Sequence, residues 1–372
     1  MAEIPLQKPE DNSEPADPNK FALSDRIFRF LFVSPAYFTD AFRQKHFELT
    51  VIFRSFDRKG GDRMALDGPN ARSTFMLSFE VPPTEAKVGV VIPQYNFVGE
   101  EVSALLGAFY GKFVINAGQM QAGDRLTVPT MWDAPCHSHA APPFNLHPRK
   151  PDGPDLRLSF AEKLLSAYFN QTSNEDDLNR ILRAAEFYRM ALENFHERPE
   201  MAYTLLLSSL ESLLDLLTYT EEDLYDPTLK ERLARIAAEC KDGTKIVSDL
   251  KGRLYQIKRK VAKLVDTFIP DTFFQQREAR EAFAVMTTRE ELRERIRAAY
   301  DLRSQLLHTG NRMGIGHLTH NSMGEEFILG KPVLPNADLA KLLVKCLTLA
   351  GLERVTSTVL RSVVTQRILV VK

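Results

Sequence analysis

Residues 289–310 of the chain read REELRERIRAAYDLRSQLLHTG, and this stretch decides how the second half of the protein folds. Apolar residues recur along it at intervals of three and four positions, which is the spacing of one helix face. Gly310 follows at a place where a left-handed residue commonly ends a helix. The stretch therefore predicts one helix over residues 289–309, with Arg303 and His308 five positions apart near its end.

Helical periodicity also dominates the sequence on both sides of this stretch. Asn174, followed by Asp176 and Asp177, is typical of a helix N-cap with an acidic first turn. Glu200 and Asp338 stand where helix N-termini favour negative charge in the same way. The all-α domain predicted from these signals covers residues 158–372, with helices at about 159–170, 174–196, 199–218, 227–241, 245–266, 289–309 and 337–369.

The first part of the chain predicts a mixture of strands and helix. Several runs alternate apolar and polar residues with period two, as half-buried strands do. The predicted elements are strands at 47–54, 73–81, 87–93 and 113–116 and a helix at 100–109. We therefore expect an α+β domain over residues 21–147, followed by the all-α helical bundle.

Two segments lack these patterns. Residues 1–20 are rich in proline and charged residues and short of aromatics, which predicts a flexible tail. Prolines also gather between residues 140 and 154, and we interpret residues 148–157 as a stiff, exposed linker between the two domains.

Length and composition narrow the class of protein. The 372 residues favour two domains, and the formal net charge of −1 means that any RNA contact must come from a local patch. Cys136, Cys240 and Cys346 are few and scattered, which favours reduced thiols in the cytoplasm. The sequence shows neither a signal-peptide pattern nor an apolar run that could span a membrane, so we expect a soluble cytoplasmic protein.

Arg303 and His308 together carry the chemistry needed to cut RNA without a metal. Arginine binds phosphate with two donors, and histidine both accepts and donates protons near neutral pH. Five positions on an ideal helix, however, separate two side chains by about 140°. Either the helix unwinds at Thr309 and Gly310 so that His308 swings round, or a second copy of the chain completes the site across a two-fold axis.

The sequence around these residues resembles a known family. The segment from Tyr300 to Gly310 reads YDLRSQLLHTG and is similar to the Apea-like branch of the HEPN superfamily, whose motif is an aromatic residue, then Asp-Leu-Arg-Ser, then His and Gly. The family's upstream helices resemble residues 184–193, 209–214 and 229–234. The similarity spans roughly residues 160–364 in the expected order.

This resemblance implies a function and a set of site residues. HEPN proteins are helical and are largely ribonucleases of bacterial defence and toxin systems. The resemblance therefore implies a metal-independent, cofactor-free endoribonuclease that acts as a homodimer, with the first domain meeting a regulatory partner or trigger. The site residues it implies are Arg303, His308, Glu211, Ser304 and Tyr300. Among them, Glu211 interrupts a helix face that is otherwise apolar, where a carboxylate without a partner is costly, so it is expected to hold Arg303 through a bidentate ion pair.

Two departures from the family motif favour an alternative. Ser304 follows the arginine where many active HEPN nucleases have Asn, Asp or His, and Thr309 separates His308 from the glycine. The alternative is a non-catalytic HEPN module that dimerises or binds a partner. In that case Arg303 and Glu211 form a structural ion pair and His308 caps the end of a helix.

Two further patterns point to binding. Lys258, Arg259 and Lys260 lie in a basic helix that could follow RNA phosphates. A solvated helix face is the preferred explanation, because acidic residues are common nearby. The run Cys136-His137-Ser138-His139 has too few donors at metal-binding spacing to predict a zinc site, so we expect no metal.

Overall fold

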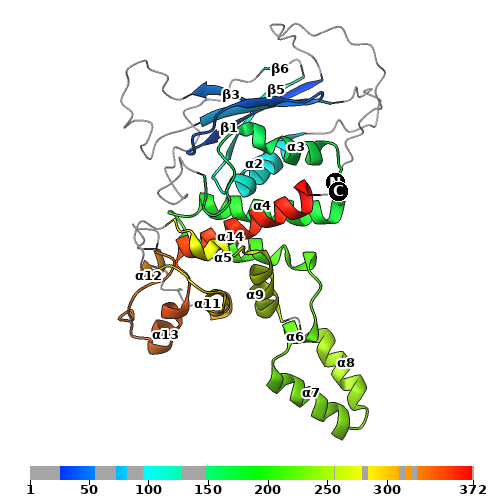
Figure 1. Ribbon diagram of the computed structural model, residues 1–372, viewed down its shortest axis with the longest axis vertical. Coiled ribbons are helices and arrows are strands. Elements are labelled where there is room, and N and C mark those ends of the chain that lie inside the picture. The colour runs from blue at the N-terminus through cyan, green and yellow to red at the C-terminus, as the bar shows by residue number, and fades with distance from the viewer. Residues whose placement is uncertain are drawn as a thin grey trace.

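The structure, a computed structural model, describes residues 26–54, 73–81, 95–123, 125–126, 148–254, 256–278, 284–309, 316–319 and 325–370. Figure 1 shows a sheet at one end of the molecule, layers of helices beneath it, and a helical hairpin that projects from the opposite end. The chain thus has an α+β part followed by a mainly helical part, which confirms this level of the prediction.

The sheet is antiparallel and has the strand order β2-β3-β4-β1-β5-β6. Its strands are β1 (Ile27–Ser34), β2 (Ala41–Arg43), β3 (Phe47–Arg54), β4 (Ser73–Glu80), β5 (Ile115–Ala122) and β6 (Arg125–Leu126). The strands predicted at 47–54 and 73–81 are confirmed as β3 and β4. Strand β1, which lies in the middle of the sheet, was not predicted from the sequence. The run at 87–93 lies outside the described residues.

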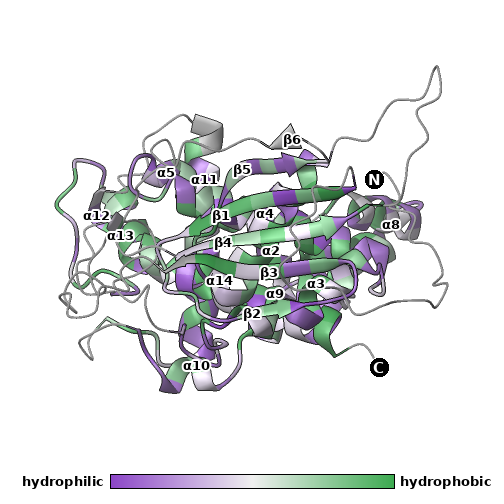
Figure 2. Ribbon diagram, turned by 90° about the horizontal axis from the view of Figure 1, so that it is seen from above, coloured by the Kyte–Doolittle hydropathy of each residue, from purple (hydrophilic) through white to green (hydrophobic). Residues whose placement is uncertain are grey.

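Helix α2 (Asn96–Tyr110) covers one face of the sheet, as seen from above in Figure 2. Phe30 and Phe32 of β1 are fully buried in the same hydrophobic core as the apolar side chains of α2. Gly99 permits this close approach, because a Cβ atom there would lie 2.6 Å from the ring of Phe30. Helix α2 ends where Gly111 adopts the left-handed conformation with a φ of 62°.

The helical part stacks in layers below α2. It comprises η1 (Leu158–Ala161), α3 (Glu162–Phe169), α4 (Glu175–Glu193), α5 (Pro199–Glu211), η2 (Leu214–Leu216), α6 (Glu221–Leu224), α7 (Pro227–Glu239), α8 (Gly243–Arg253), α9 (Ile257–Phe268), α10 (Thr272–Gln275), α11 (Arg289–Thr309), α12 (Gly316–Thr319), α13 (Ala337–Lys345), α14 (Leu349–Val364) and the π-helical turn η3 (Thr365–Leu369). Helix α14 lies at the centre, since every residue from 351 to 361 is buried. Helices α7 and α8 form the projecting hairpin.

Two of the helices predicted from the sequence are each two helices. The run at 245–266 is interrupted by Gln256, whose φ of 47° no right-handed helix can contain, so α8 and α9 are separate. The run at 337–369 breaks before Thr348, whose hydroxyl caps α14 by accepting a 2.9 Å hydrogen bond from Gly351 N. The cap predicted at Asn174 is confirmed, because its side chain accepts from Asp177 N.

The proline-rich segment at 148–157 is packed into the protein instead of being exposed along its length. Arg149 is 3% exposed, and Pro151 and Leu156 are buried. A single hydrophobic cluster also runs from the sheet through α2 into the helical layers. The domain boundaries at residues 147 and 158 stay a prediction. Within the described ranges, none of the helices is long and apolar enough to cross a bilayer.

Truncating Phe75 tests the aromatic packing of the sheet. Its ring is 0% exposed and lies 5.6 Å from that of Phe32 and 5.4 Å from that of Phe38, measured between centroids. We expect Phe75→Ala to lower the free energy of unfolding by about 3–5 kcal/mol in chemical denaturation, through lost contacts and a cavity. The control Phe160→Ala, at a ring that is 44% exposed, should cost less than about 1 kcal/mol. Equal losses would contradict the packing described.

Candidate functional site

Arg303 projects from α11 toward the C-terminal end of α5. Its Nη1 atom donates to Glu211 Oε1 at 2.5 Å, and its Nη2 atom lies 3.4 Å from Ser208 Oγ. The side chains of Arg303 and Glu211 are 14% and 22% exposed. The expected ion pair is therefore present, but the two terminal nitrogens of Arg303 reach different residues instead of gripping Glu211 together. Among the described residues, Arg303 Nε is buried without a hydrogen-bond partner.

Tyr300 packs beside this ion pair, one turn before Arg303. The guanidinium carbon of Arg303 lies 5.7 Å from the centroid of the Tyr300 ring, within the range of a cation–π contact. Burial raises the pKa of the Tyr300 hydroxyl, and the negative charge of Glu211 adds to the rise. Tyr300 therefore stays protonated at neutral pH and can donate a hydrogen bond.

Helix α11 continues without interruption through His308 to Thr309. The helix therefore does not unwind before Thr309, whereas Gly310, the other residue at which unwinding was considered, lies outside the described residues. Because the helix is continuous, Arg303 and His308 leave its axis about 140° apart. The side chain of His308 lies outside the described part of the structure, whereas Ser304 is partly buried. That a second copy of the chain completes the site stays a prediction.

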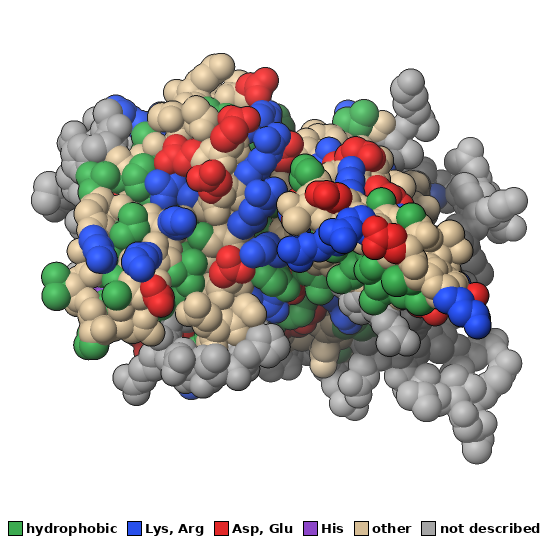
Figure 3. Space-filling view, turned by 90° about the horizontal axis from the view of Figure 1, so that it is seen from below, with side chains coloured by type: hydrophobic (Ala, Val, Ile, Leu, Met, Phe, Trp, Pro, Cys, Tyr) green, Lys and Arg blue, Asp and Glu red, His purple; other side chains and the backbone are tan. Residues whose placement is uncertain are grey.

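The three basic residues predicted to bind RNA lie on α9, which packs against α11. Lys258 Nζ is 2.8 Å from Asp301 Oδ1, and Arg259 Nη2 is 2.8 Å from Asp226 Oδ2. Lys260 lies over an aromatic ring, with its Nζ atom 5.4 Å from the centroid. Figure 3, which views the protein from the end that carries the hairpin, shows the basic side chains of this face interspersed with acidic ones. The structure thus pairs two of the three positive charges with carboxylates, which weakens the field available to a phosphate chain.

A groove of about 1040 Å³ is lined by residues of α2, α4 and the end of α5. Ser208 and Glu211 form part of its wall, so the groove and Arg303 share two residues. The charged residues of this carboxylate groove are Glu100, Glu101, Glu175, Arg180, Arg183, Glu186, Glu211 and Asp215. The excess of carboxylates gives this groove a negative field, which repels phosphates.

Among the described residues, no cluster of three or more His, Cys, Asp or Glu side chains could hold a metal ion. The run from Cys136 to His139 lies outside the described residues. Sequence reasoning missed Ser208 as a neighbour of Arg303. Its position three residues before Glu211, on the same face of α5, was the available signal.

Comparisons with known proteins add no assignment to this geometry: no family model, no curated protein and no solved structure matches the chain. The resemblance to HEPN proteins therefore stays a prediction from the motif around Arg303 and from the upstream helices.

A double-mutant cycle tests whether Glu211 and Arg303 act as a pair. We expect Glu211→Gln and Arg303→Met to lower the free energy of unfolding less in combination than the sum of the single changes, with a coupling of about 1–2 kcal/mol. The control pair Lys341 and Asp338 is 67% and 89% exposed, and its coupling should be near zero. Additive effects at Glu211 and Arg303 would show that the contact between them does not contribute to the free energy of unfolding.

Proposed function

We propose that the protein is a metal-independent endoribonuclease of the HEPN type. The observation that carries the proposal is the placement of Arg303. Glu211, Ser208 and Tyr300 fix its side chain, which keeps 14% exposure, on the same continuous helix as His308. A fixed guanidinium on a helix that also carries a histidine suits the stabilisation and proton transfer that cleavage of RNA requires.

The reaction is an intramolecular transesterification. The 2′-hydroxyl of one nucleotide attacks the adjacent phosphorus while the bond to the 5′-oxygen of the next nucleotide breaks. His308 takes the proton of the attacking hydroxyl or gives one to the leaving oxygen, an effect of about 10² to 10⁴-fold. Arg303 stabilises the negative charge that develops on the phosphate oxygens. The products are a 2′,3′-cyclic phosphate and a 5′-hydroxyl.

The proposal includes a homodimer. Because Arg303 and His308 of one chain diverge by about 140°, the acting pair combines Arg303 of one protomer with His308 of its partner. A two-fold axis near the end of α11 brings two such pairs together. We also propose, from the resemblance alone, a role in bacterial defence in the cytoplasm, with the sheet-bearing part meeting the regulatory trigger.

A second candidate is a HEPN module that binds a partner without catalysis. The observation that favours it is the pairing of the basic side chains. Lys258 and Arg259 each face an aspartate, and Arg303 faces Glu211. Cations that are already paired with carboxylates can belong to a surface with a structural role as well as to a surface that binds RNA.

Cleavage of a labelled RNA pool in excess EDTA decides between the two candidates. We expect the wild type to cut and to leave 2′,3′-cyclic phosphate ends, and Arg303→Ala and His308→Ala each to reduce the rate at least about 100-fold, because each removes a group that acts on the phosphate. The matched controls Arg235→Ala and His317→Ala change an exposed arginine on α7 and an exposed histidine on α12, and they should cut at the wild-type rate.

Each outcome assigns a function. Cutting that persists in both site variants would remove Arg303 and His308 from the site. No cutting by the wild type, in a protein that folds and dimerises, would favour the non-catalytic module.

Mixing two inactive variants tests the site shared between protomers. A heterodimer of Arg303→Ala and His308→Ala retains one intact pair, so subunit exchange should restore about a quarter of the wild-type rate. As a control, Arg303→Ala mixed with the Arg303→Ala/His308→Ala double variant contains no intact arginine and should stay inactive. Recovery in neither mixture, while heterodimers form, would mean that the reacting groups come from one protomer.

A further inference from the structure

The carboxylate groove is lined by one face of each of three helices. On α4, which packs against both α2 and α5, lining residues recur at intervals of three and four positions from Glu175 to Phe187. On α2 and on the end of α5 the lining follows the spacing i, i+3, i+4, i+7, beginning at Phe97 and at Ser208. This spacing places side chains on a single helix face. The groove is therefore an elongated space between three helix faces.

The dimensions of the groove fit an extended peptide. Twelve positions of the continuous helix α4 separate Glu175 from Phe187, which corresponds to a length of about 18 Å. The volume of about 1040 Å³ spread over this length gives a width of roughly 8–9 Å, less than the roughly 10–12 Å of a helix with its side chains. An extended chain advances about 3.3 Å per residue, so the groove has room for about five or six residues.

Three carboxylates of the groove form no ion pair with any other residue in the described part of the chain. They are Glu175 and Glu186 on α4 and Asp215 after α5, and all three are exposed. A fourth carboxylate, Glu101 of α2, is partly buried and accepts a 2.5 Å hydrogen bond from the Tyr168 hydroxyl, which carries no positive charge. These four groups can each pair with a cation from outside without giving up an existing ion pair.

The basic residues of the lining do not cancel these charges. Arg180 Nη1 lies 3.8 Å from Asp177 Oδ1, so its charge is shared with a carboxylate outside the groove. Arg183 is the other arginine among the lining residues. The groove therefore attracts positive charge along its length. A single metal ion does not match it, because no three carboxylates among the described residues converge on one point.

Apolar and neutral polar side chains complete the lining. The ring of Phe97 is 36% exposed and that of Phe187 is partly buried, so both can pack against an apolar side chain or against the alkyl part of a lysine or an arginine. Asn179 is exposed and carries an amide that can both donate to and accept from a peptide backbone. The groove thus offers partners for the backbone and for two kinds of side chain.

We propose that the carboxylate groove binds an extended basic segment of a partner protein, about six residues long, that carries both basic and apolar side chains. The length and width of the groove select an extended chain, its unpaired carboxylates select the charge, and Phe97 and Phe187 select the apolar side chains. Such a partner would contact α2 of the sheet-bearing part and the end of α5 at the same time. Its binding requires no catalysis by Arg303 or His308.

Fluorescence anisotropy of the full chain with a labelled, end-capped hexapeptide of alternating arginine and leucine tests this docking. We expect saturable binding that weakens as the salt concentration rises, because salt screens the attraction between exposed charges. The same peptide with glutamate in place of arginine should not bind, since the groove repels negative charge.

Removing the three unpaired carboxylates locates the binding. The variant Glu175→Gln/Glu186→Gln/Asp215→Asn changes exposed side chains and should lower the affinity for the basic hexapeptide at least about tenfold. The matched control Glu231→Gln/Glu294→Gln/Asp249→Asn removes the same number of exposed charges outside the groove. It should keep the affinity within about twofold of the wild type, because distant exposed charges are screened.

Phe97→Ala tests the apolar contact and should lower the affinity at least about threefold, whereas Phe160→Ala, at an exposed ring outside the groove, should leave it unchanged. Equal losses in the two triple variants would reduce the binding to general charge attraction and overturn the proposal, as would a wild type that does not bind the hexapeptide. Spermine that binds as tightly as the hexapeptide, with no effect of Phe97→Ala, would assign the groove to a small polycation instead.

Discussion

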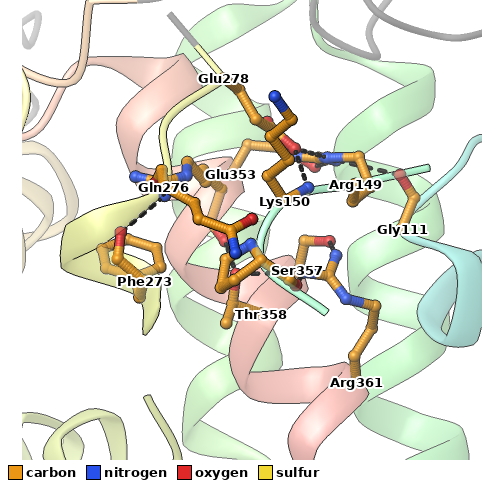
Figure 4. A network of polar contacts seen from close by, with 12 residues as sticks. Gly111, Arg149, Lys150, Phe273, Gln276, Glu278, Glu353, Ser357, Thr358 and Arg361 are labelled. Carbon is orange, nitrogen blue, oxygen red and sulfur yellow. Dashed lines mark hydrogen bonds and ion pairs between the residues drawn. The ribbon is translucent and has the colours of Figure 1, made fainter. Parts of the chain in front are cut away.

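Arg149 donates hydrogen bonds to Glu278, Glu353 and the Gly111 carbonyl oxygen through all five of its guanidinium N–H groups (Figure 4). The arrangement of the sheet-bearing part relative to the helical part depends on these hydrogen bonds. Buried ions are expensive to desolvate and are tolerated only where every donor and acceptor is matched. An apolar cluster would hold the same segments together with less precision. The ionic cluster allows one arrangement of α2, the proline-rich segment and α14, and it makes every loosened arrangement costly.

The candidate site also contains an arginine whose side chain is fixed by an ion pair and a hydrogen bond, but this arginine is less buried. Glu211, Ser208 and Tyr300 fix Arg303 near the surface. Helix α14 packs against α5, the helix that carries Glu211 and Ser208. Fixing a long side chain before a ligand arrives removes an entropy loss that binding would otherwise incur. The carboxylate groove lies against the same residues and repels phosphates.

Much of the fold could be predicted from local signals. The period-two runs that became β3 and β4, the cap at Asn174 and the helix at 289–309 are set by residues close in sequence. The pairing of Glu211 with Arg303 was expected because an acidic residue interrupts an apolar helix face. Contacts between residues that are far apart in the sequence could not be predicted. Strand β1 is a nearly continuous apolar run. Nothing in the sequence indicates that the partners of Arg149 lie 129 and 204 positions later.

The projecting hairpin of α7 and α8 has a consequence for how the protein can vary. Within the described residues of these two helices, Leu233 and Val247 are the only large apolar side chains that are buried. A unit with so small a core contributes little to the stability of the whole and can change its surface at low thermodynamic cost. The surface of the hairpin can therefore change in sequence while the ionic cluster around Arg149 and helix α11 stay fixed.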